Sequence, residues 1–368
     1  MSKPRVVLVR GHQANSWHLR PWSRLADRFD VVLLQTKGNW FDTEAADLSP
    51  LPVRTLRDYL PRGRVGELAV RVPGDRYLGL RDRLAGADIV HPQDLVFWYS
   101  AQAAELKPEL GYKLVLTVWE TLPFLDAYRN FRTRPYRRPI LEQTDLFLCT
   151  TERAKTTLLL EGASEERIVV SPPGVDLDLF RAPVLEEPDH HLIVSAGRLV
   201  WEKGHQELLR ALALIDRPDV RGLIIGSGPE EKRLRRHAEE LGLGERVEFR
   251  REVPYAEMPS VYARASCLVL GSIPTWFSDE QFGMVLVEAM AAGLPVIATS
   301  TGAIPEVLAG NGQLVAAGDW IGLARALEEG PLARSPGERV SYDEKLLQHY
   351  SSAAAAERLA SAYDRVLG

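Results

Sequence analysis

Short apolar runs rich in β-branched residues recur along this chain, and each is followed by a stretch with helical character. The first series comprises residues 6–9, 31–34, 114–118 and 146–148, and the second comprises residues 192–194, 222–225, 267–270 and 295–298. Strands that lack polar alternation are buried on both faces, which is typical of parallel sheets covered by helices. The pattern therefore predicts an α/β protein.

The two series predict two Rossmann-like, doubly wound domains rather than one long sheet. Each opens with a strand followed by a glycine, Gly11 in the first series and Gly197 in the second. The length of 368 residues also suits two domains, because one domain usually holds roughly 100–200 residues. The segment Pro-Pro-Gly-Val-Asp at 172–176 interrupts the pattern. We expect the first domain to span 1–175 and the second 176–345.

Composition excludes several classes of protein. The net charge is −5, whereas a nucleic-acid binder is expected to carry a strongly basic domain. The apolar stretch near residue 6 is too short for a signal peptide, and no apolar run approaches the ~20 residues of a membrane span. Cys149 and Cys267 each lie in a strand-like run, which argues against a disulfide and fits a reducing, cytoplasmic location.

The most informative segment is Asp279–Ile297. It predicts a loop that ends at Gly283 and then an apolar helix, in which Glu288 is the one charge. A lone carboxylate there is costly unless it has a partner. Glu280 precedes it by eight residues, about 12 Å if helical, which suits one ligand held at two places. The helix start between them offers free amides to a phosphate. Alternatively, Glu288 caps or pairs with a neighbouring element.

Two cations follow the first strand of the second series. Arg198 comes directly after Gly197, and Lys203 comes five residues later. A guanidinium and an ammonium at a strand end can clamp a diphosphate and stabilise the charge on a departing one. The alternative is a solvated surface pair. Gly226 and Gly228 follow another strand and permit close backbone approach to a ligand, but their spacing falls short of Gly-x-Gly-x-x-Gly.

Taken in order, these motifs resemble the retaining glycosyltransferases of the family 4 type, which have the GT-B fold. The resemblance rests on Gly-Arg…Lys-Gly (197–204), Gly-x-Gly-Pro (226–229) and Glu-x-Phe-Gly…Glu-Ala-Met-Ala-x-Gly-x-Pro-Val-Ile-Ala (280–298). It covers about residues 170–330 strongly, and the N-terminal half only in layout. It implies two domains with a cleft between them, an acceptor side in the first, and a C-terminal helix (346–368) packed back on that first domain.

The resemblance also implies an activity and a role for each motif residue. A hexose, guessed to be mannose or glucose, moves from a nucleotide-diphosphate sugar to an acceptor hydroxyl with retention at the anomeric carbon. The catalytic set holds the donor diphosphate and contacts the sugar; it comprises Arg198, Lys203 and Glu280. The donor-binding set comprises Gly11, Gly226, Gly228, Phe282, Gly283, Met284 and Glu288, of which Glu288 holds the ribose.

The chain departs from the family at two places. Relatives often carry a histidine where this chain has Trp119-Glu120, so we assign these two residues to the acceptor side, with a cleft-wall or core role as the alternative for Trp119. Relatives often have glycine where Arg251 stands, which leaves the base open. An arginine cluster at 129–138 suggests a phosphorylated acceptor or peripheral contact with an anionic membrane; a solvated helix face is the alternative.

We expect neither a metal nor another cofactor. The sequence has no His/Cys cluster with ligand spacing, and Asp176-Leu177-Asp178 fits a helix N-terminus or linker. Arg198 and Lys203 can neutralise the charge that a divalent ion neutralises elsewhere. Three other activities remain open: a GT-B sugar-nucleotide epimerase, a nucleotide-sugar binder without transfer, and an NAD-dependent oxidoreductase.

Overall fold

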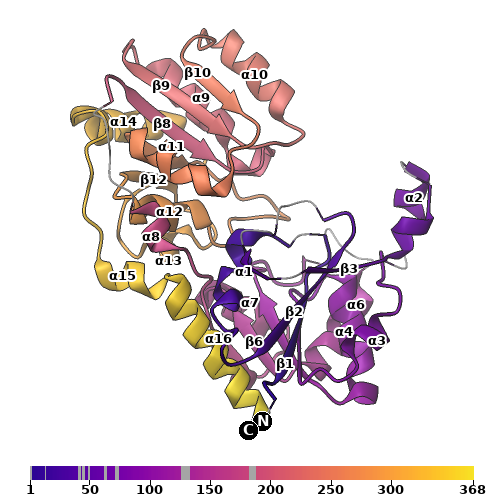
Figure 1. Cartoon of the computed structure of the whole chain (residues 1–368). Coiled ribbons are helices and arrows are strands. Elements are labelled where there is room, and N and C mark those ends of the chain that lie inside the picture. The colour runs from indigo at the N-terminus through magenta and orange to yellow at the C-terminus, as the bar shows by residue number, and fades with distance from the viewer. Residues whose placement is uncertain are drawn as a thin grey trace. The chain divides into compact units, whose positions relative to one another are not determined.

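The computed structural model describes residues 2–12, 14–39, 43, 46–48, 50–61, 64–70, 74–125, 133–181 and 188–368. The chain forms two compact units, whose elements are labelled in Figure 1. Unit 1 holds Met1–Gly174 and Ser352–Gly368, and unit 2 holds Val175–Ser351. We describe each unit by itself.

Unit 1 is built on a parallel sheet of seven described strands in the order β3-β2-β1-β4-β5-β6-β7. The strands are β1 (Arg5–Val9), β2 (Asp30–Thr36), β3 (Pro50–Val53), β4 (Ile89–His91), β5 (Lys113–Val118), β6 (Leu146–Cys149) and β7 (Ile168–Val170). The helices are α1 (Ser16–Ser23), α2 (Arg64–Ala69), α3 (Leu80–Leu84), α4 (Trp98–Leu110), α6 (Arg134–Gln143), α7 (Glu152–Leu160) and α16 (Ser352–Leu367). Two apolar clusters cover the two faces of this sheet. Successive residues of β1 and β5 belong alternately to one cluster and to the other.

Unit 2 repeats the plan with a parallel sheet of six described strands in the order β10-β9-β8-β11-β12-β13. The strands are β8 (His191–Ala196), β9 (Val220–Ile225), β10 (Val247–Arg250), β11 (Cys267–Leu270), β12 (Val296–Thr299) and β13 (Gln313–Val315). The helices are α8 (Leu177–Phe180), α9 (His205–Leu214), α10 (Glu231–Glu240), α11 (Met258–Arg264), α12 (Met284–Ala291), α13 (Ile304–Leu308), α14 (Trp320–Glu329) and α15 (Glu344–His349). The fold is thus the expected α/β fold with two Rossmann-like sheets.

Both sheets reverse their strand order at one point. The chain starts on a central strand, adds two strands to one side, and then crosses to the other side, so the reversal falls between β1 and β4 in unit 1 and between β8 and β11 in unit 2. In open α/β sheets, ligands bind outside the carboxyl ends of the strands at this reversal. The topology therefore marks one candidate ligand position in each unit.

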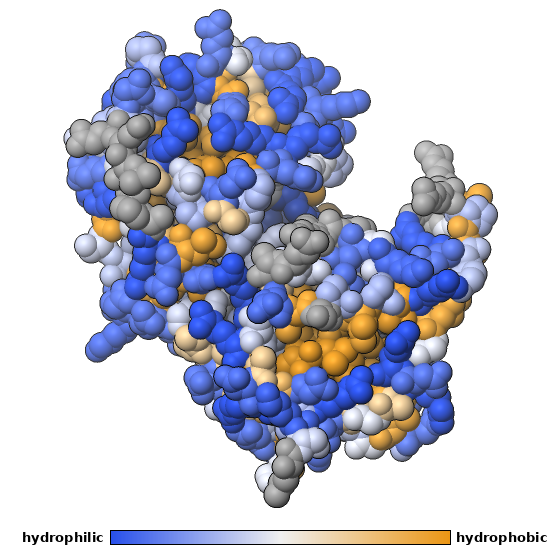
Figure 2. Space-filling view, viewed as in Figure 1, coloured by the Kyte–Doolittle hydropathy of each residue, from blue (hydrophilic) through white to orange (hydrophobic). Residues whose placement is uncertain are grey.

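The edge strand β3 lies at one border of the unit 1 sheet. Figure 2 shows apolar residues gathered on the visible face of unit 1 near β2 and β3, and Leu51 of β3 is 38% exposed. Pro50 and Pro52 lack the amide hydrogen that would extend a ladder. These prolines leave this border a poor template for another strand.

The C-terminal segment forms two helices rather than the single one expected over 346–368. Helix α15 ends at His349 in unit 2, and α16 begins at Ser352 in unit 1. Tyr363 of α16 accepts a hydrogen bond from the Trp22 indole of α1 at 2.7 Å, and α1 and α16 lie side by side in Figure 1. None of the described helices has the length and apolarity needed to cross a bilayer.

Candidate functional site

The reversal point of unit 2 carries an ion pair whose acid is buried and whose lysine is partly exposed. Lys203, in the 3-10 turn η5 (Trp201–Lys203) after β8, donates to both carboxylate oxygens of Glu280 at 2.8 and 2.7 Å. Ser272, just after β11, donates to Glu280 Oε2 at 2.6 Å, and Thr299 donates to the carbonyl of Ser272 at 2.6 Å. The Glu280 side chain is 7% exposed. Burial alone would raise its pKa, but Lys203 and Ser272 lower it below the ordinary value, so Glu280 is an anion at neutral pH.

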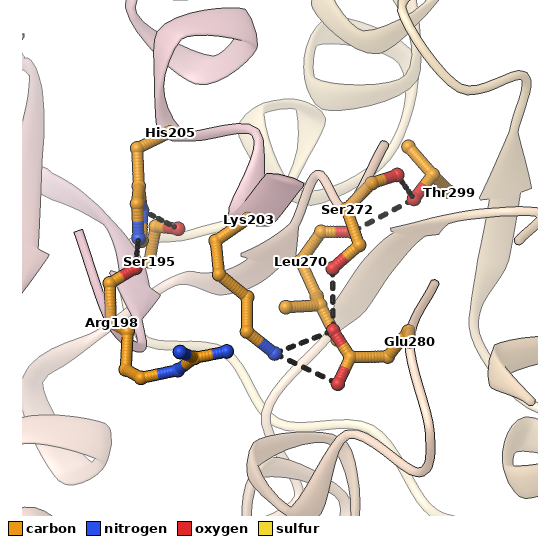
Figure 3. A network of polar contacts seen from close by, with 8 residues as sticks. All are labelled: Ser195, Arg198, Lys203, His205, Leu270, Ser272, Glu280 and Thr299. Atoms are coloured by element: carbon orange, nitrogen blue, oxygen red, sulfur yellow. Dashed lines mark hydrogen bonds and ion pairs between the residues drawn. The ribbon is translucent and has the colours of Figure 1, made fainter. Parts of the chain in front are cut away.

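Arg198 lies beside this pair and is exposed. Figure 3 shows its guanidinium extending toward the Lys203 ammonium, and its charge also favours the ionised form of Glu280. Within the described part of the chain, the Arg198 guanidinium has no hydrogen bond or ion pair. The structure thus brings together all three residues of the expected catalytic set, with one cation bound to an acid and one available to an anion.

The glycines around this site are required by contacts between loops. A Cβ on Gly226 would lie 1.9 Å from the carbonyl oxygen of Gly197, and one on Gly228 would lie 2.3 Å from that of Leu199. Gly204 has φ +67°, and a Cβ there would lie 1.7 Å from the carbonyl oxygen of Gly271. The sequence suggested that Gly226 and Gly228 approach a ligand; in the structure their missing side chains make room for the chain itself, which fixes the loop that carries Arg198 and Lys203.

His205 is a residue of this site that sequence reasoning missed. It is buried at the start of α9, its Nδ1 lies 2.9 Å from Ser195 Oγ, and its Nε2 lies 3.2 Å from the carbonyl oxygen of Arg198. A carbonyl only accepts, so Nε2 carries the hydrogen and Nδ1 accepts from the serine. Burial lowers the pKa of His205 to about 4. A neutral histidine therefore ties the end of β8 to the backbone that carries Arg198; its place directly after Lys203-Gly204 was the available signal.

Glu288 has a different environment from Glu280. It lies one turn into α12, is 4% exposed, and accepts a hydrogen bond from the Tyr262 hydroxyl of α11 at 3.2 Å. Burial raises the pKa of Glu288 to about 7. Among the described residues, no hydrogen bond or ion pair joins Glu288 to Lys203 or Glu280. The contact with Tyr262 is the pairing with a neighbouring element that the sequence offered as an alternative for Glu288. The role of Glu288 in holding the ribose stays a prediction.

The start of α12 is formed as the sequence indicated. Gly283 is the N-cap with φ +82°, a left-handed conformation that favours glycine, and Met284 is the first helical residue. Phe282 is buried, and its ring forms a T-shaped pair with that of Tyr350 at a centroid distance of 5.5 Å. Phe282 therefore anchors the loop by its side chain, and any contact with a ligand would come from its backbone.

Gly11 of the donor-binding set and the two residues assigned to the acceptor side, Trp119 and Glu120, belong to unit 1. Gly11 follows β1 with φ +60°, and a Cβ there would lie 2.5 Å from the Tyr99 ring. Trp119 stacks on His18 at a centroid distance of 4.6 Å, and its amide donates to Asp94 at 2.8 Å. Glu120 accepts from the amides of the two residues that follow it, both at 2.9 Å. Trp119 and Glu120 line two different hollows.

Other residues singled out in the sequence have structural partners or lie outside the description. Arg251 is exposed and pairs with Glu231 at 3.2 Å. Asp176 is the N-cap position of α8. Of the arginine cluster, Arg129 and Arg132 lie outside the described residues, whereas Arg134, Arg137 and Arg138 belong to α6. Across the part of the chain that is described, no three His, Cys, Asp or Glu side chains form a group able to hold a metal ion.

Comparison with known proteins matches both units. Residues 22–179 match the family model described as Glycosyltransferase Family 4, and residues 178–334 match Glycosyl transferases group 1. The D-inositol 3-phosphate glycosyltransferase of Corynebacterium jeikeium is 31% identical over 78% of this chain and 74% of its own length. The chain belongs to the glycosyltransferases of the family 4 type.

Two further comparisons show how much of this family 4 glycosyltransferase is shared with a relative and with a solved structure. The D-inositol 3-phosphate glycosyltransferase of Mycolicibacterium smegmatis is 33% identical over 62% of the chain, but the chain spans only 54% of that relative's length. The crystal structure of Anabaena HepE in complex with UDP-glucose superposes with a TM-score of 0.78, covering 98% of this chain and 99% of that one at 18% identity. The structural likeness supports the GT-B fold.

Proposed function

We propose that the protein transfers a hexose from a nucleotide-diphosphate sugar to an acceptor hydroxyl, with retention at the anomeric carbon. The observation that carries this proposal is the arrangement of two cations and one ionised acid at the reversal point of unit 2. Arg198 is exposed and Lys203 is bound to the buried carboxylate of Glu280. Such a set offers positive charge to a diphosphate and a hydrogen-bond acceptor to sugar hydroxyls at adjacent places.

The reaction needs positioning and charge stabilisation from these residues. The bond between the anomeric carbon and the diphosphate oxygen breaks, the acceptor oxygen bonds to that carbon, and the acceptor proton passes to the departing diphosphate. Arg198 and Lys203 stabilise the negative charge that builds on the leaving group. In this proposal, Glu280 orients the sugar through the sugar hydroxyls. Glu288 holds the ribose, and the free amides at the start of α12 bind a donor phosphate.

The proposal keeps the other expectations from the sequence. Arg198 and Lys203 take the place of a metal, no cofactor besides the donor is required, and Cys149 and Cys267 are buried free thiols that fit a cytoplasmic location. Mannose or glucose is the proposed sugar. Peripheral contact with an anionic membrane is part of the proposal and is tested by co-sedimentation with anionic and neutral vesicles.

The first experiment is a thermal-shift screen over the diphosphates of uridine, guanosine and adenosine and their sugar conjugates. A ligand that binds the folded state raises the unfolding temperature in proportion to the logarithm of its concentration over Kd. We expect one base to stabilise the protein well above the other two. Absence of any shift would contradict the donor assignment.

The second experiment follows the product of the preferred donor by NMR with and without an acceptor. Retention predicts that the anomeric configuration of the donor is kept, and an inverted product contradicts it. Change of the donor sugar without an acceptor supports the epimerase, and donor binding with no nucleotide release supports a binder without transfer. A run with chelator tests metal independence.

A further inference from the structure

A small cavity of unit 1 lies at the reversal point of its sheet. Its volume is about 40 Å³, and its polar lining includes Arg10, His18, Gln93, Thr117, Trp119 and Thr150. Arg10 follows β1 and Gln93 follows β4, the two strands between which the order reverses. No aspartate or glutamate is among the described residues that line it. The cavity thus occupies, in unit 1, the place that the ion pair occupies in unit 2.

Arg10 brings a buried positive charge to this cavity. It is 5% exposed, its Nη1 donates to the carbonyl oxygens of Val9 and His91, and its guanidinium carbon lies 5.0 Å from the centre of the Trp22 ring. No carboxylate of the described residues lies within 4.0 Å of it. The charge of Asp94 acts on Arg10 through space, without a hydrogen bond between the two side chains. Asp94 Oδ1 instead accepts the amide of Trp119. Burial lowers the pKa of Arg10, because removing the guanidinium from water disfavours its charged form.

A chain of hydrogen bonds directs a second donor at the cavity. The Tyr363 hydroxyl accepts from the Trp22 indole at 2.7 Å, so its own hydrogen goes to His91 Nδ1 at 2.6 Å. His91 then carries its hydrogen on Nε2 and donates it to Thr117 Oγ1 at 2.8 Å. The Thr117 oxygen is thereby used as an acceptor, and its hydrogen is left for a group in the cavity.

His18 supplies a third donor by the same reasoning. The Asn15 Oδ1 oxygen accepts the amide of His18 at 2.9 Å, so the side-chain nitrogen of Asn15 is the donor to His18 Nδ1 at 3.1 Å. The hydrogen of the neutral imidazole therefore lies on Nε2. Arg10, His18 and Thr117 all line the cavity and each has a hydrogen to donate, whereas no carboxylate is among the described lining residues.

We propose that this cavity binds an anionic oxygen group, a phosphate or a carboxylate, of the acceptor. Donor groups that line one cavity beside a buried cation with no carboxylate bound to it match oxygen atoms that bear negative charge. The volume suits such a group and not a whole sugar, because each water needs roughly 10–15 Å³ by the same measure. That the anion belongs to the acceptor rests on the proposed function; that the cavity takes an anion does not.

The test measures binding of inorganic phosphate to the full chain by thermal shift and calorimetry, in a phosphate-free buffer at constant ionic strength. We expect phosphate to raise the unfolding temperature by roughly 2 °C or more at saturation and chloride to have no such effect. Arg10→Gln keeps a donor toward the His91 carbonyl but removes the charge, and we expect it to weaken phosphate binding at least tenfold. Arg339→Gln is the matched control, because the Arg339 guanidinium also donates to backbone carbonyls, those of Tyr262, Ala263 and Ala265, but is not among the residues that line this cavity.

Two outcomes overturn the inference: a wild-type protein that does not respond to phosphate, and an Arg10→Gln protein that responds like the wild type. If Arg10→Gln does not fold, a crystal of the wild-type protein soaked in selenate decides, since the anomalous signal locates the anion in this cavity or elsewhere. A soluble polyol phosphate and phosphatidylinositol vesicles, assayed as acceptors, then distinguish a free phosphate ester from a lipid headgroup. Binding of nucleoside diphosphates to the wild-type protein is measured in parallel. If the wild-type protein binds phosphate in this cavity but binds no nucleoside diphosphate, the result counts against the proposed function alone.

Discussion

The two units place a cation at the same point of the same topology but balance its charge differently. In unit 2, Lys203 follows β8 and is bound to Glu280, which follows β11. In unit 1, Arg10 follows β1, and none of the described carboxylates pairs with it. A paired cation keeps its position whether or not a ligand is present, whereas an unpaired buried one gains most when an anion arrives. Under the two proposals, unit 2 holds a preorganised donor site and unit 1 holds an acceptor site that is completed by its ligand.

The largest effect is expected from removing the cation of the balanced site. Lys203→Ala removes a positive charge that is proposed to stabilise the departing diphosphate. It should lower kcat by about 10²–10³-fold, the range seen when one stabilising group is lost. Turnover is measured at saturating donor, with Lys232→Ala, an exposed lysine of α10, as the control. Near wild-type turnover would show that the diphosphate role is wrong.

Removing each of the two cations should change the free energy of unfolding by a different amount. Lys203→Met leaves the buried carboxylate of Glu280 without its cation and should lower the free energy of unfolding by about 3–5 kcal/mol. Arg10→Met leaves no ion-paired acid behind and loses the bonds to two carbonyls and the contact with the Trp22 ring, so about 1–2 kcal/mol is expected. Thermal unfolding of both variants provides the comparison, and equal losses would break it.

Glu280 and Glu288, two buried acids of unit 2, should differ in their response to pH. The folded pKa of Glu288 is raised to about 7, above the unfolded value of about 4.3, so folded protein binds a proton that unfolded protein has lost. Stability therefore falls as pH rises between these values. Glu288→Gln removes this loss and should stabilise the protein by on the order of 3 kcal/mol near pH 8 but little near pH 4.

Unfolding temperature measured against pH checks this prediction, with Glu329→Gln on the exposed side of α14 as the control. The same variant should bind nucleoside diphosphates more weakly if Glu288 holds the ribose. An unchanged pH dependence in Glu288→Gln would show that this carboxyl is not the group that titrates.

The smallest predicted effect concerns the backbone that carries Arg198. His205→Phe keeps the ring volume but loses both hydrogen bonds at the carboxyl end of β8, and we expect kcat/KM to fall about tenfold, a cost of about 1.4 kcal/mol. His191 begins the same strand, is buried, and lies 3.2 Å from Ser266 Oγ, so His191→Phe is a matched control at the opposite end. A purely structural role predicts that both variants lower stability and activity alike.

Much of the fold followed from local patterns. The apolar runs predicted eight of the strands, because a strand buried on both faces needs continuous apolar side chains. The pattern gave no sign of β3, since Pro50 and Pro52 are unusual in a strand and are tolerated only at a sheet edge. Likewise, nothing local marked the break between α15 and α16, which coincides with the passage from one unit to the other.

The sequence by itself determined the fold class and pointed to the residues of the proposed donor site, because glycines, cations and acids stand at fixed distances from strand ends and parallel strands end at one edge. The tertiary structure alone decided which charges meet: Glu280 reaches Lys203 across 77 positions, whereas Glu288 faces Tyr262. It also showed Arg10 buried with none of the described carboxylates paired to it. Burial and pairing depend on side chains from distant segments, and these set the electrostatic energy of a charge far more than its neighbours in sequence do.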